Sequence, residues 1–78
     1  MKNNIQIEQF GARLKELRKT AGLTQAALAY EAGIGIRTIY NLEKGQQAIT
    51  IDVLISLAKA LHATPAQMFE GVEIEYEE

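Results

Sequence analysis

The stretch LTQAALAYEAGIGIRTIYNLEKG, residues 23–45, decides the fold expected for this chain. It predicts two short helices, at about 25–32 and 36–44, joined by a turn of three or four residues. Thr24 can cap the first helix, because its hydroxyl can accept a hydrogen bond from an unpaired amide one turn later. Gly33 stands where that helix should end, since glycine takes the left-handed conformation at little cost. Gly45 should end the second helix.

The short connection determines how the two helices meet. Two helices joined so closely must cross steeply, and a helix projecting from such a corner can enter the major groove of DNA. Ile39, Leu42 and the stem of Glu43 share one face of the second helix and are expected to point inward.

The outward face of the second helix carries polar side chains. At about 100° per residue, Arg37, Asn41 and Lys44 lie nearly opposite the inward face, and Tyr40 lies on the flank. Arginine can fork onto guanine O6 and N7, and asparagine can pair with adenine N6 and N7. The alternative is an ordinary solvated helix surface, but the position after a capped helix and a tight turn favours base recognition.

Length and composition limit the classes of protein to which the chain can belong. Seventy-eight residues form one small domain, and the absence of cysteine excludes disulfides and cysteine-ligated zinc. No apolar run reaches the roughly 18 residues of a membrane span, and the N-terminus lacks a secretory pattern, so a cytoplasmic protein is expected. The net charge is −2, but five of the ten acidic residues lie in the last nine positions. Residues 1–69 carry eight basic and five acidic residues, a balance of +3, which permits DNA binding.

Three further helices are expected around this pair, which makes the fold class all-α with five helices. The first, at about 5–20, has one apolar stripe and should turn Arg13, Lys15, Glu16 and Lys19 to solvent; Asn3 or Asn4 could cap it. The fourth should follow the N-cap Thr50, and the fifth should run from Pro65 to Phe69. The two expected stripes are Ile7, Phe10, Leu14, Leu17 and Ala21, and Ile51, Leu54, Leu57, Ala58 and Leu61. In the second helix Ala26, Ala29 and Ala32 are expected to allow close approach of a neighbouring helix.

The last eight residues differ from the helical domain at 1–70. Val72, Ile74 and Tyr76 alternate with glutamates, a period of two that is typical of a strand. Residues 71–78 are therefore either a frayed acidic tail or a short C-terminal strand that pairs with its counterpart in a second subunit.

The chain resembles the phage repressor and Cro-type helix-turn-helix domains, also called the xenobiotic-response-element type. The resemblance covers about residues 7–69 and depends on Arg18, GLTQ at 22–25, LA at 28–29, AGI at 32–34 and LEKG at 42–45. It implies a compact five-helix, repressor-like domain that binds double-stranded DNA as a homodimer, with its third helix in the major groove.

The resemblance also implies residue roles. Arg18 and Glu43 would form an ion pair between the first and third helices, which makes Glu43 structural rather than catalytic. Base edges would be contacted from the third helix, and the DNA backbone from its flank, the following loop and the start of the second helix. The base-contacting residues would be Ile36, Arg37, Thr38 and Asn41, and the backbone-contacting residues Gln25, Tyr40, Lys44, Gln46 and Gln47.

Three features depart from the family pattern. Gly35 stands at the cap of the third helix, where the family prefers serine, threonine or aspartate. Ile36 replaces a usually polar residue and could offer only apolar contact, such as to a thymine methyl. Gln46 and Gln47 are uncharged, so few phosphates would be neutralised there and the salt dependence should be shallow.

No catalytic site is expected. His62 is the only histidine, and near a helix C-terminus it is most simply a solvated residue. Ser56 lacks an acid–base partner nearby, and GIG at 33–35 is too short for a phosphate-binding loop. The alternating glutamates of the tail are more typical of a solvated face than of a cation site. No enzyme activity, cofactor or metal is therefore expected.

We expect a sequence-specific transcription regulator, a repressor of a pseudo-palindromic operator, that acts as a homodimer. Three alternatives stay open: an antitoxin with a toxin partner, a controller of a restriction–modification operon, and a protein-interaction module with residual DNA binding. The sequence does not specify the operator, the regulated genes, the sign of regulation or an effector.

Overall fold

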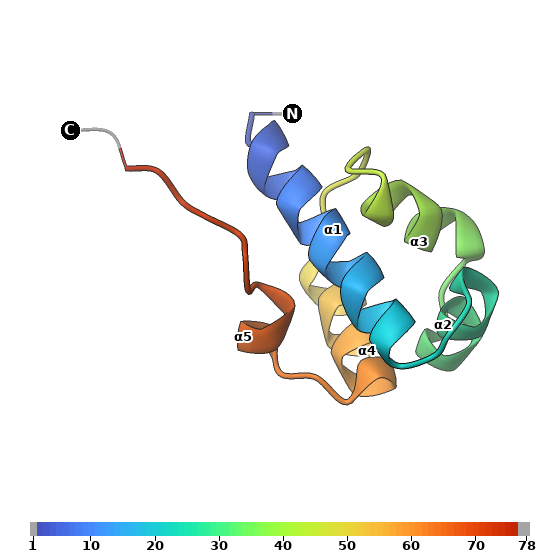
Figure 1. Cartoon of the computed structure of the whole chain (residues 1–78). Helices are drawn as coiled ribbons and strands as arrows, with labels where there is room; N and C mark the ends of the chain where they lie inside the picture. Colours follow the sequence, from blue (N-terminus) through green and yellow to red (C-terminus); the bar gives the residue numbers. More distant parts are fainter. Residues whose placement is uncertain (1, 77–78) are drawn as a thin grey trace.

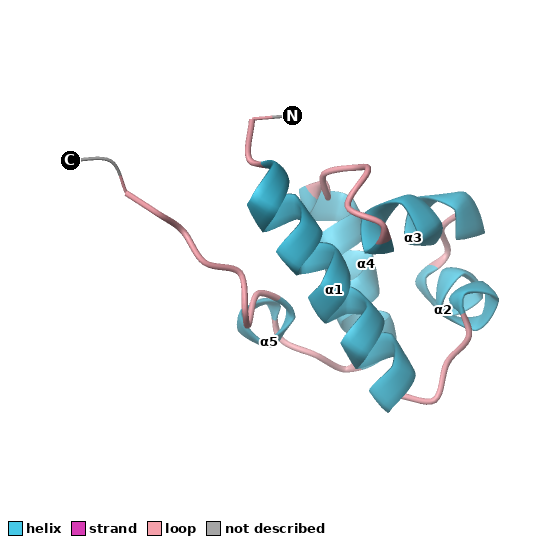
Figure 2. Cartoon of the chain, turned by 45° about the horizontal axis from the view of Figure 1, so that its top comes forward, coloured by secondary structure: helices cyan, strands magenta, loops and turns pink. Residues whose placement is uncertain are grey.

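Five helices succeed one another in the computed structural model, which describes residues 2–76 (Figure 1). Figure 2 shows that the described part consists of helices and connecting loops. The expected all-α class and five-helix order are confirmed, and each boundary that was predicted lies within one residue of the observed one. The helices are α1 (Asn4–Thr20), α2 (Gln25–Ala32), α3 (Ile36–Glu43), α4 (Ile51–Leu61) and α5 (Pro65–Met68).

The core lies where α1, α3 and the α2–α4 pair meet. Its centre is mostly aliphatic. Gly11 in α1 lies directly against the backbone of α3 near Leu42, and a Cβ atom at this glycine would approach the Glu43 carbonyl oxygen to 3.0 Å. The two helices therefore cross at a distance that excludes any side chain at position 11. The fully buried side chains are Leu14, Leu28, Ile39, Leu42, Leu57 and Met68.

Side-chain caps begin α4 and α5 as predicted. The Thr50 hydroxyl accepts a hydrogen bond from the Val53 amide at 3.2 Å. Thr64 and Gln67 form a capping box, in which each side chain bonds the other residue's amide. The predicted cap of α1 is wrong: Asn3 is the N-cap residue, but its side chain makes no cap hydrogen bond.

Two residues of α1, Phe10 and Arg13, join it to α5 and the residues that follow. Phe10 and Phe69 pack with ring centroids 5.1 Å apart. Arg13 donates from Nε to the Gln67 carbonyl at 2.8 Å and from Nη2 to Glu70 Oε2 at 3.0 Å, and it also pairs with Glu16. Arg13 was expected to face solvent, and this prediction is wrong, because the docking of α5 supplies hydrogen-bond acceptors beside it.

The apolar stripes are shorter than predicted. Ala21 lies just beyond α1 and is exposed, and Ile51 at the start of α4 is 72% exposed. Both stand at helix ends, where neighbouring helices no longer cover the stripe. In α2, Ala29 is buried and Ala32 half-buried, but Ala26 is exposed, since the helix buries a single narrow face.

The tail after α5 is extended and lies beside the N-terminal half of α1 in Figures 1 and 2. Within the described residues, 72–76 form no strand, so the expected short strand is not seen in this part of the chain. Residues 77 and 78, which the alternating pattern also includes, lie outside the described residues. Between residues 2 and 76, no helix combines the length and the apolar character needed to cross a bilayer.

Candidate nucleic-acid interface

The corner between α2 and α3 is held by local hydrogen bonds. The Thr24 hydroxyl accepts from the Ala27 amide at 3.0 Å, as predicted. Gly33 ends α2 with φ of 68°, in the left-handed region. The Gly33 amide donates to the Tyr30 carbonyl at 3.2 Å and the Ile34 amide to the Ala29 carbonyl at 3.0 Å. These bonds satisfy the last carbonyls of α2 and fix the direction in which α3 leaves the turn.

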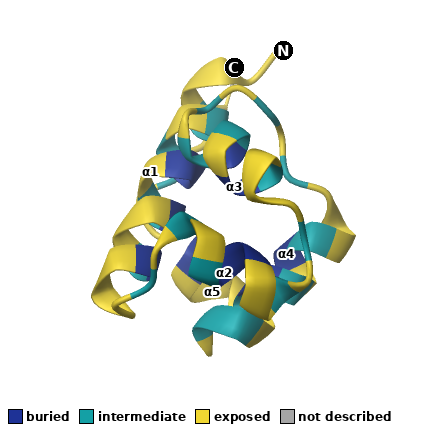
Figure 3. Cartoon of the chain, turned by 90° about the vertical axis from the view of Figure 1, so that its right-hand side faces the viewer, coloured by how far each residue is buried: buried dark blue, intermediate teal, exposed yellow. Residues whose placement is uncertain are grey.

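The inward face of α3 is the predicted one. Ile39 is 0% and Leu42 1% exposed. Figure 3 shows α3 with buried positions on one side of the ribbon and exposed positions on the other. Because the buried side is anchored in the core, the opposite side of α3 has a defined orientation.

Four residues lie on the outer side and flank of α3. Arg37 is exposed, and Ile36 at the first position is 52% exposed. Thr38 and Asn41 are half-buried. The structure therefore brings the four predicted base-contacting residues onto one short helix, with Arg37 the most accessible polar group among them.

The carboxamide of Asn41 has a neighbour that the sequence analysis did not identify. Asn41 Nδ2 lies 3.5 Å from Gln47 Oε1, at the long limit of a hydrogen bond. An amide nitrogen carries two hydrogens, so one can point to Gln47 while the other remains for an acceptor such as adenine N7. Gln47 is half-buried, whereas Gln46 is exposed. Of the two predicted loop contacts, Gln46 is therefore the more accessible.

A cation lies on the flank of α3. Lys44 Nζ stands 5.8 Å from the centroid of the Tyr40 ring, four residues earlier. This is a cation–π geometry between exposed side chains. It keeps the ammonium group and the phenol next to each other, where a phosphate could be approached by both.

Behind α3, the buried pair of Arg18 and Glu43 forms a polar network with the half-buried Gln25. Arg18 Nε donates to Glu43 Oε2 at 2.6 Å and Nη2 donates to Oε1 at 3.0 Å, so the pair is bidentate. Arg18 Nη1 also donates to the Leu23 carbonyl at 2.8 Å. The side chains of Arg18 and Glu43 are 9% and 3% exposed. The network ties α1 and the turn before α2 to the C-terminal end of α3.

Gln25 has a role that the sequence analysis missed. Its Nε2 donates to Glu43 Oε1 at 3.1 Å, so this side chain connects α2 to the ion pair. A glutamine at the first position of a helix carries no periodic signal that would reveal such a long-range bond. Contact between Gln25 and a phosphate remains a prediction.

The ion pair also affects titration. Hydrogen bonding to Glu43, reinforced by its negative charge, raises the pKa of Arg18 despite the opposing effect of burial. A raised pKa in the folded state means that this stabilisation is lost only as the pH rises through the arginine range. Arg18 therefore contributes no loss of stability near neutral pH.

The acidic tail does not lie on the α3 side of the molecule. In Figures 1 and 2, α3 and the acidic tail lie on opposite sides of α1. The segment that carries the glutamates at 73 and 75 is thus separated from α3 by α1. Among residues 2–76, no three histidine, aspartate or glutamate side chains are grouped to hold a metal ion.

Comparison with known proteins identifies the family. A helix-turn-helix domain model matches residues 9–70. The HTH-type transcriptional regulator PrpR of Mycobacterium tuberculosis is 43% identical over 61 residues, which are 78% of this chain and 12% of PrpR. The chain thus spans about an eighth of that relative.

Two smaller proteins match over most of their length. Control protein C.BamHI of Bacillus amyloliquefaciens is 27% identical over 75 residues, which are 95% of this chain and 91% of that protein. The crystal structure of the restriction-modification controller protein C.AhdI from Aeromonas hydrophila is similar with a TM-score of 0.77 at 34% identity. That match covers 80% of this chain and 94% of C.AhdI. The chain therefore belongs to the helix-turn-helix family of DNA-binding transcriptional regulators.

Proposed function

We propose that this chain is a cytoplasmic, homodimeric repressor that reads a pseudo-palindromic operator with α3. The observation that carries the proposal is the division of α3 between a fully buried face and an outward face with Arg37 and Asn41. In a symmetric dimer each subunit would meet one half-site, with centres separated by about 34 Å, one turn of the duplex. No enzymatic role is proposed.

The proposed base contacts follow the chemistry of the outward face. The Arg37 guanidinium suits guanine O6 and N7, and the Asn41 carboxamide suits adenine. Ile36 offers an apolar contact to a thymine methyl, and Thr38 a hydroxyl. The DNA backbone would be met from around this face by Gln25, Tyr40, Lys44, Gln46 and Gln47.

Replacement of Arg37 by alanine is expected to weaken operator binding by about 1–3 kcal/mol and to relax preference at one base pair per half-site. The reason is the loss of a bidentate contact on an otherwise unchanged helix. Fluorescence anisotropy with DNA selected from a random pool would measure the effect. Lys15→Ala is the matched control, because it also removes one positive charge, from an exposed site on α1. Equal losses in the two variants would refute a specific role for Arg37.

The homodimer is proposed to form through α4. Ile51 and Ile55 are 72% and 47% exposed and lie four residues apart, on one side of the helix. Exposed aliphatic side chains grouped on one face are candidates for association with another chain. Antiparallel packing of this face on its counterpart would place the two α3 helices in a symmetric arrangement.

Ile51→Glu is expected to convert the dimer into a monomer and to weaken operator binding on the order of 100-fold, because the two half-sites are no longer bound together. The monomer should stay folded, since glutamate is favourable in the first turn of a helix. Ile5→Glu is the matched control, at another exposed isoleucine (63%) in the first turn of a helix. Sedimentation equilibrium would measure the association. A dimer undiminished by Ile51→Glu would reject this interface.

A second candidate function is control of a restriction–modification operon. It is supported by the match of this chain to more than nine-tenths of two controller proteins, C.BamHI and C.AhdI. The test is the position of the operator: a controller would bind upstream of an operon that encodes a methyltransferase or an endonuclease. Binding at unrelated promoters would remove this candidate and leave the general repressor.

A further inference from the structure

The tail that follows α5 is fastened to α1 along one of its edges. Gln6 Nε2 donates to the Glu73 carbonyl at 2.9 Å, and Gln9 Oε1 accepts from the Glu73 amide at 3.0 Å. Residues 6 and 9 lie three apart on one face of α1. The two glutamines thus hold both backbone groups of Glu73 in the way that a neighbouring strand would.

This arrangement leaves the other edge of the tail open. In an extended chain, successive residues direct their N–H and C=O groups to opposite edges. With Glu73 turned to α1, the backbone groups of Ile74 point away from the domain. Among the described residues, neither the amide nor the carbonyl of Ile74 has a backbone or side-chain partner. An open strand edge of this kind can be extended by a strand from another chain.

Apolar surface lies next to the open edge. Ile74 is 65% and Tyr76 84% exposed, whereas Val72 packs on the core. A groove of about 330 Å³ lies between α1 and the tail, beside Val72 and Ile74, and a second groove of about 270 Å³ shares Gln6, Phe69 and Val72 with it. The first groove is lined by Asn3, Gln6, Phe69, Val72, Ile74 and Glu75. An added strand on the open edge would therefore find apolar contact with the exposed side chains of Ile74 and Tyr76.

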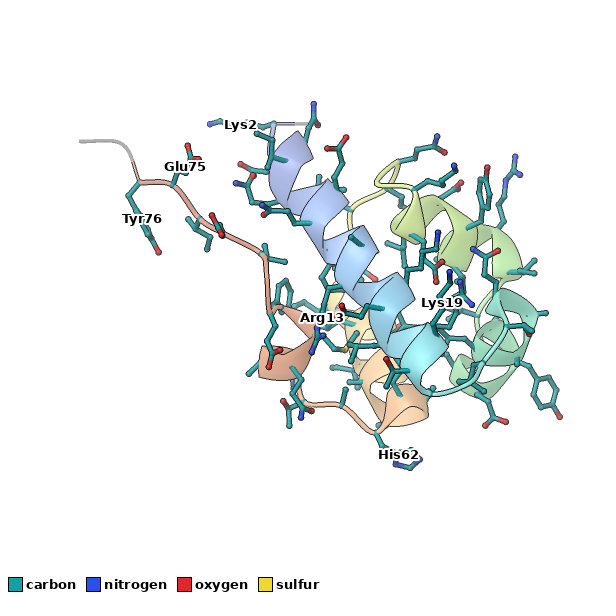
Figure 4. All side chains as sticks on the ribbon, in the orientation of Figure 1. Lys2, Arg13, Lys19, His62, Glu75 and Tyr76 are labelled. Carbon is teal, nitrogen blue, oxygen red and sulfur yellow. The ribbon has the colours of Figure 1, made fainter. Side chains whose placement is uncertain are left out.

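The charge of the tail determines which strand fits. In the described part of the chain, Glu70 pairs with Arg13, but Glu73 and Glu75 form no ion pair. The sequence adds two more glutamates at 77 and 78 and no basic residue after Lys59. Figure 4 shows Glu75 and Tyr76 on the part of the tail that extends away from the helices. A second copy of this tail would bring glutamates opposite glutamates, which destabilises a strand pair, whereas opposite charges stabilise it.

We propose that residues 72–76 bind a basic, extended segment of a partner protein by β-strand addition. Basic side chains of the partner strand lie against Glu73 and Glu75, and its alternate apolar side chains lie against Ile74 and Tyr76. The Gln6 and Gln9 bonds hold the acceptor edge in place before the partner arrives. This interaction is independent of DNA binding, because the tail and α3 lie on opposite sides of α1.

The experiment titrates the full-length ¹⁵N-labelled protein with a synthetic peptide of alternating lysine and valine. Saturable binding is expected, with hydrogen exchange of the Ile74 amide slowed at least about tenfold and that of the Glu75 amide unchanged. The control peptides are alternating glutamate and valine, which inverts the charge, and an all-lysine peptide, which keeps charge without strand propensity. Equal binding by either control peptide would overturn the proposal.

A pair of proline variants tests the edge. Ile74→Pro removes the N–H that faces the partner, and it should weaken lysine–valine binding about fivefold to tenfold. Glu75→Pro removes an N–H on the opposite edge. It should weaken peptide binding only as much as Glu75→Gln does, since Glu75→Gln removes the charge and keeps the N–H. Both sites are exposed, so melting temperatures should stay unchanged. Binding unaffected by Ile74→Pro would overturn the proposal. The Ile74 amide can also be followed in samples without peptide. If its protection from hydrogen exchange grows with protein concentration, a second copy of the tail occupies the edge, and the proposal is overturned.

Discussion

Glu43→Ala is expected to lower the free energy of unfolding by about 3–5 kcal/mol, because it leaves a buried guanidinium without its counter-charge. Arg18 would retain the Leu23 carbonyl as an acceptor but lose both bonds to the carboxylate. Gln25 would lose its bond to Glu43 as well. Both charged side chains are at most 9% exposed, so water does not replace the missing partner. Small domains have total stabilities of about 5–15 kcal/mol, so much of the margin would disappear.

Urea denaturation followed by circular dichroism would measure this loss. Glu43→Gln is the matched control, since it keeps the shape and one oxygen acceptor and should cost less. The double variant Arg18→Met, Glu43→Leu should recover most of the stability, because it replaces the whole pair by apolar side chains. A loss below about 1 kcal/mol for Glu43→Ala would show that the network does not hold α1 and α3 together.

Gly11→Ala is the second substitution with a large expected effect. It should lower the free energy of unfolding by about 3 kcal/mol. Alanine favours helix over glycine by about 1 kcal/mol, so propensity alone predicts stabilisation. The contact with α3 reverses the sign, because an added Cβ would lie within 3.2 Å of the Glu43 carbonyl carbon and closer still to the Leu42 carbonyl oxygen. These are backbone atoms, and relief requires that α3 move away from α1.

Gly35→Ala is the control for this second prediction. Position 35 has an ordinary extended backbone, and no other group lies within 4 Å of an added Cβ. It should change stability by less than about 1 kcal/mol, since only the helix cap is altered. Thermal unfolding of the two variants gives the comparison. Similar midpoints for Gly11→Ala and Gly35→Ala would mean that the α1–α3 crossing is not close-packed.

Local signals accounted for most of the fold. Caps such as Thr24, Thr50 and Thr64 lie one residue before the helices they begin, and Gly33 and Gly45 take positive φ angles after α2 and α3. These features act within one helical turn, so the sequence alone reveals them. The inward face of α3 also followed from its spacing, and the Arg18–Glu43 pair from resemblance to a known family.

Contacts between distant polar or small residues could not be predicted in the same way. The closeness at Gly11 and the bond from Gln25 to Glu43 depend on how helices cross, which leaves no periodic pattern in the sequence. The same holds for Arg13, whose partners come from the segment around α5. The ends of the stripes at Ala21 and Ile51 were predicted as buried because periodicity does not show where neighbouring helices stop.

The central claim is that α3 presents a sequence-reading face to DNA. The most direct measurement is selection of bound duplexes from a random pool, with the full-length protein, read by sequencing. The account predicts enrichment of an inverted repeat whose half-site centres are about 34 Å apart, with a guanine and an adenine among the preferred bases. The claim would be contradicted if no sequence were enriched at any salt concentration, with protein shown to be folded.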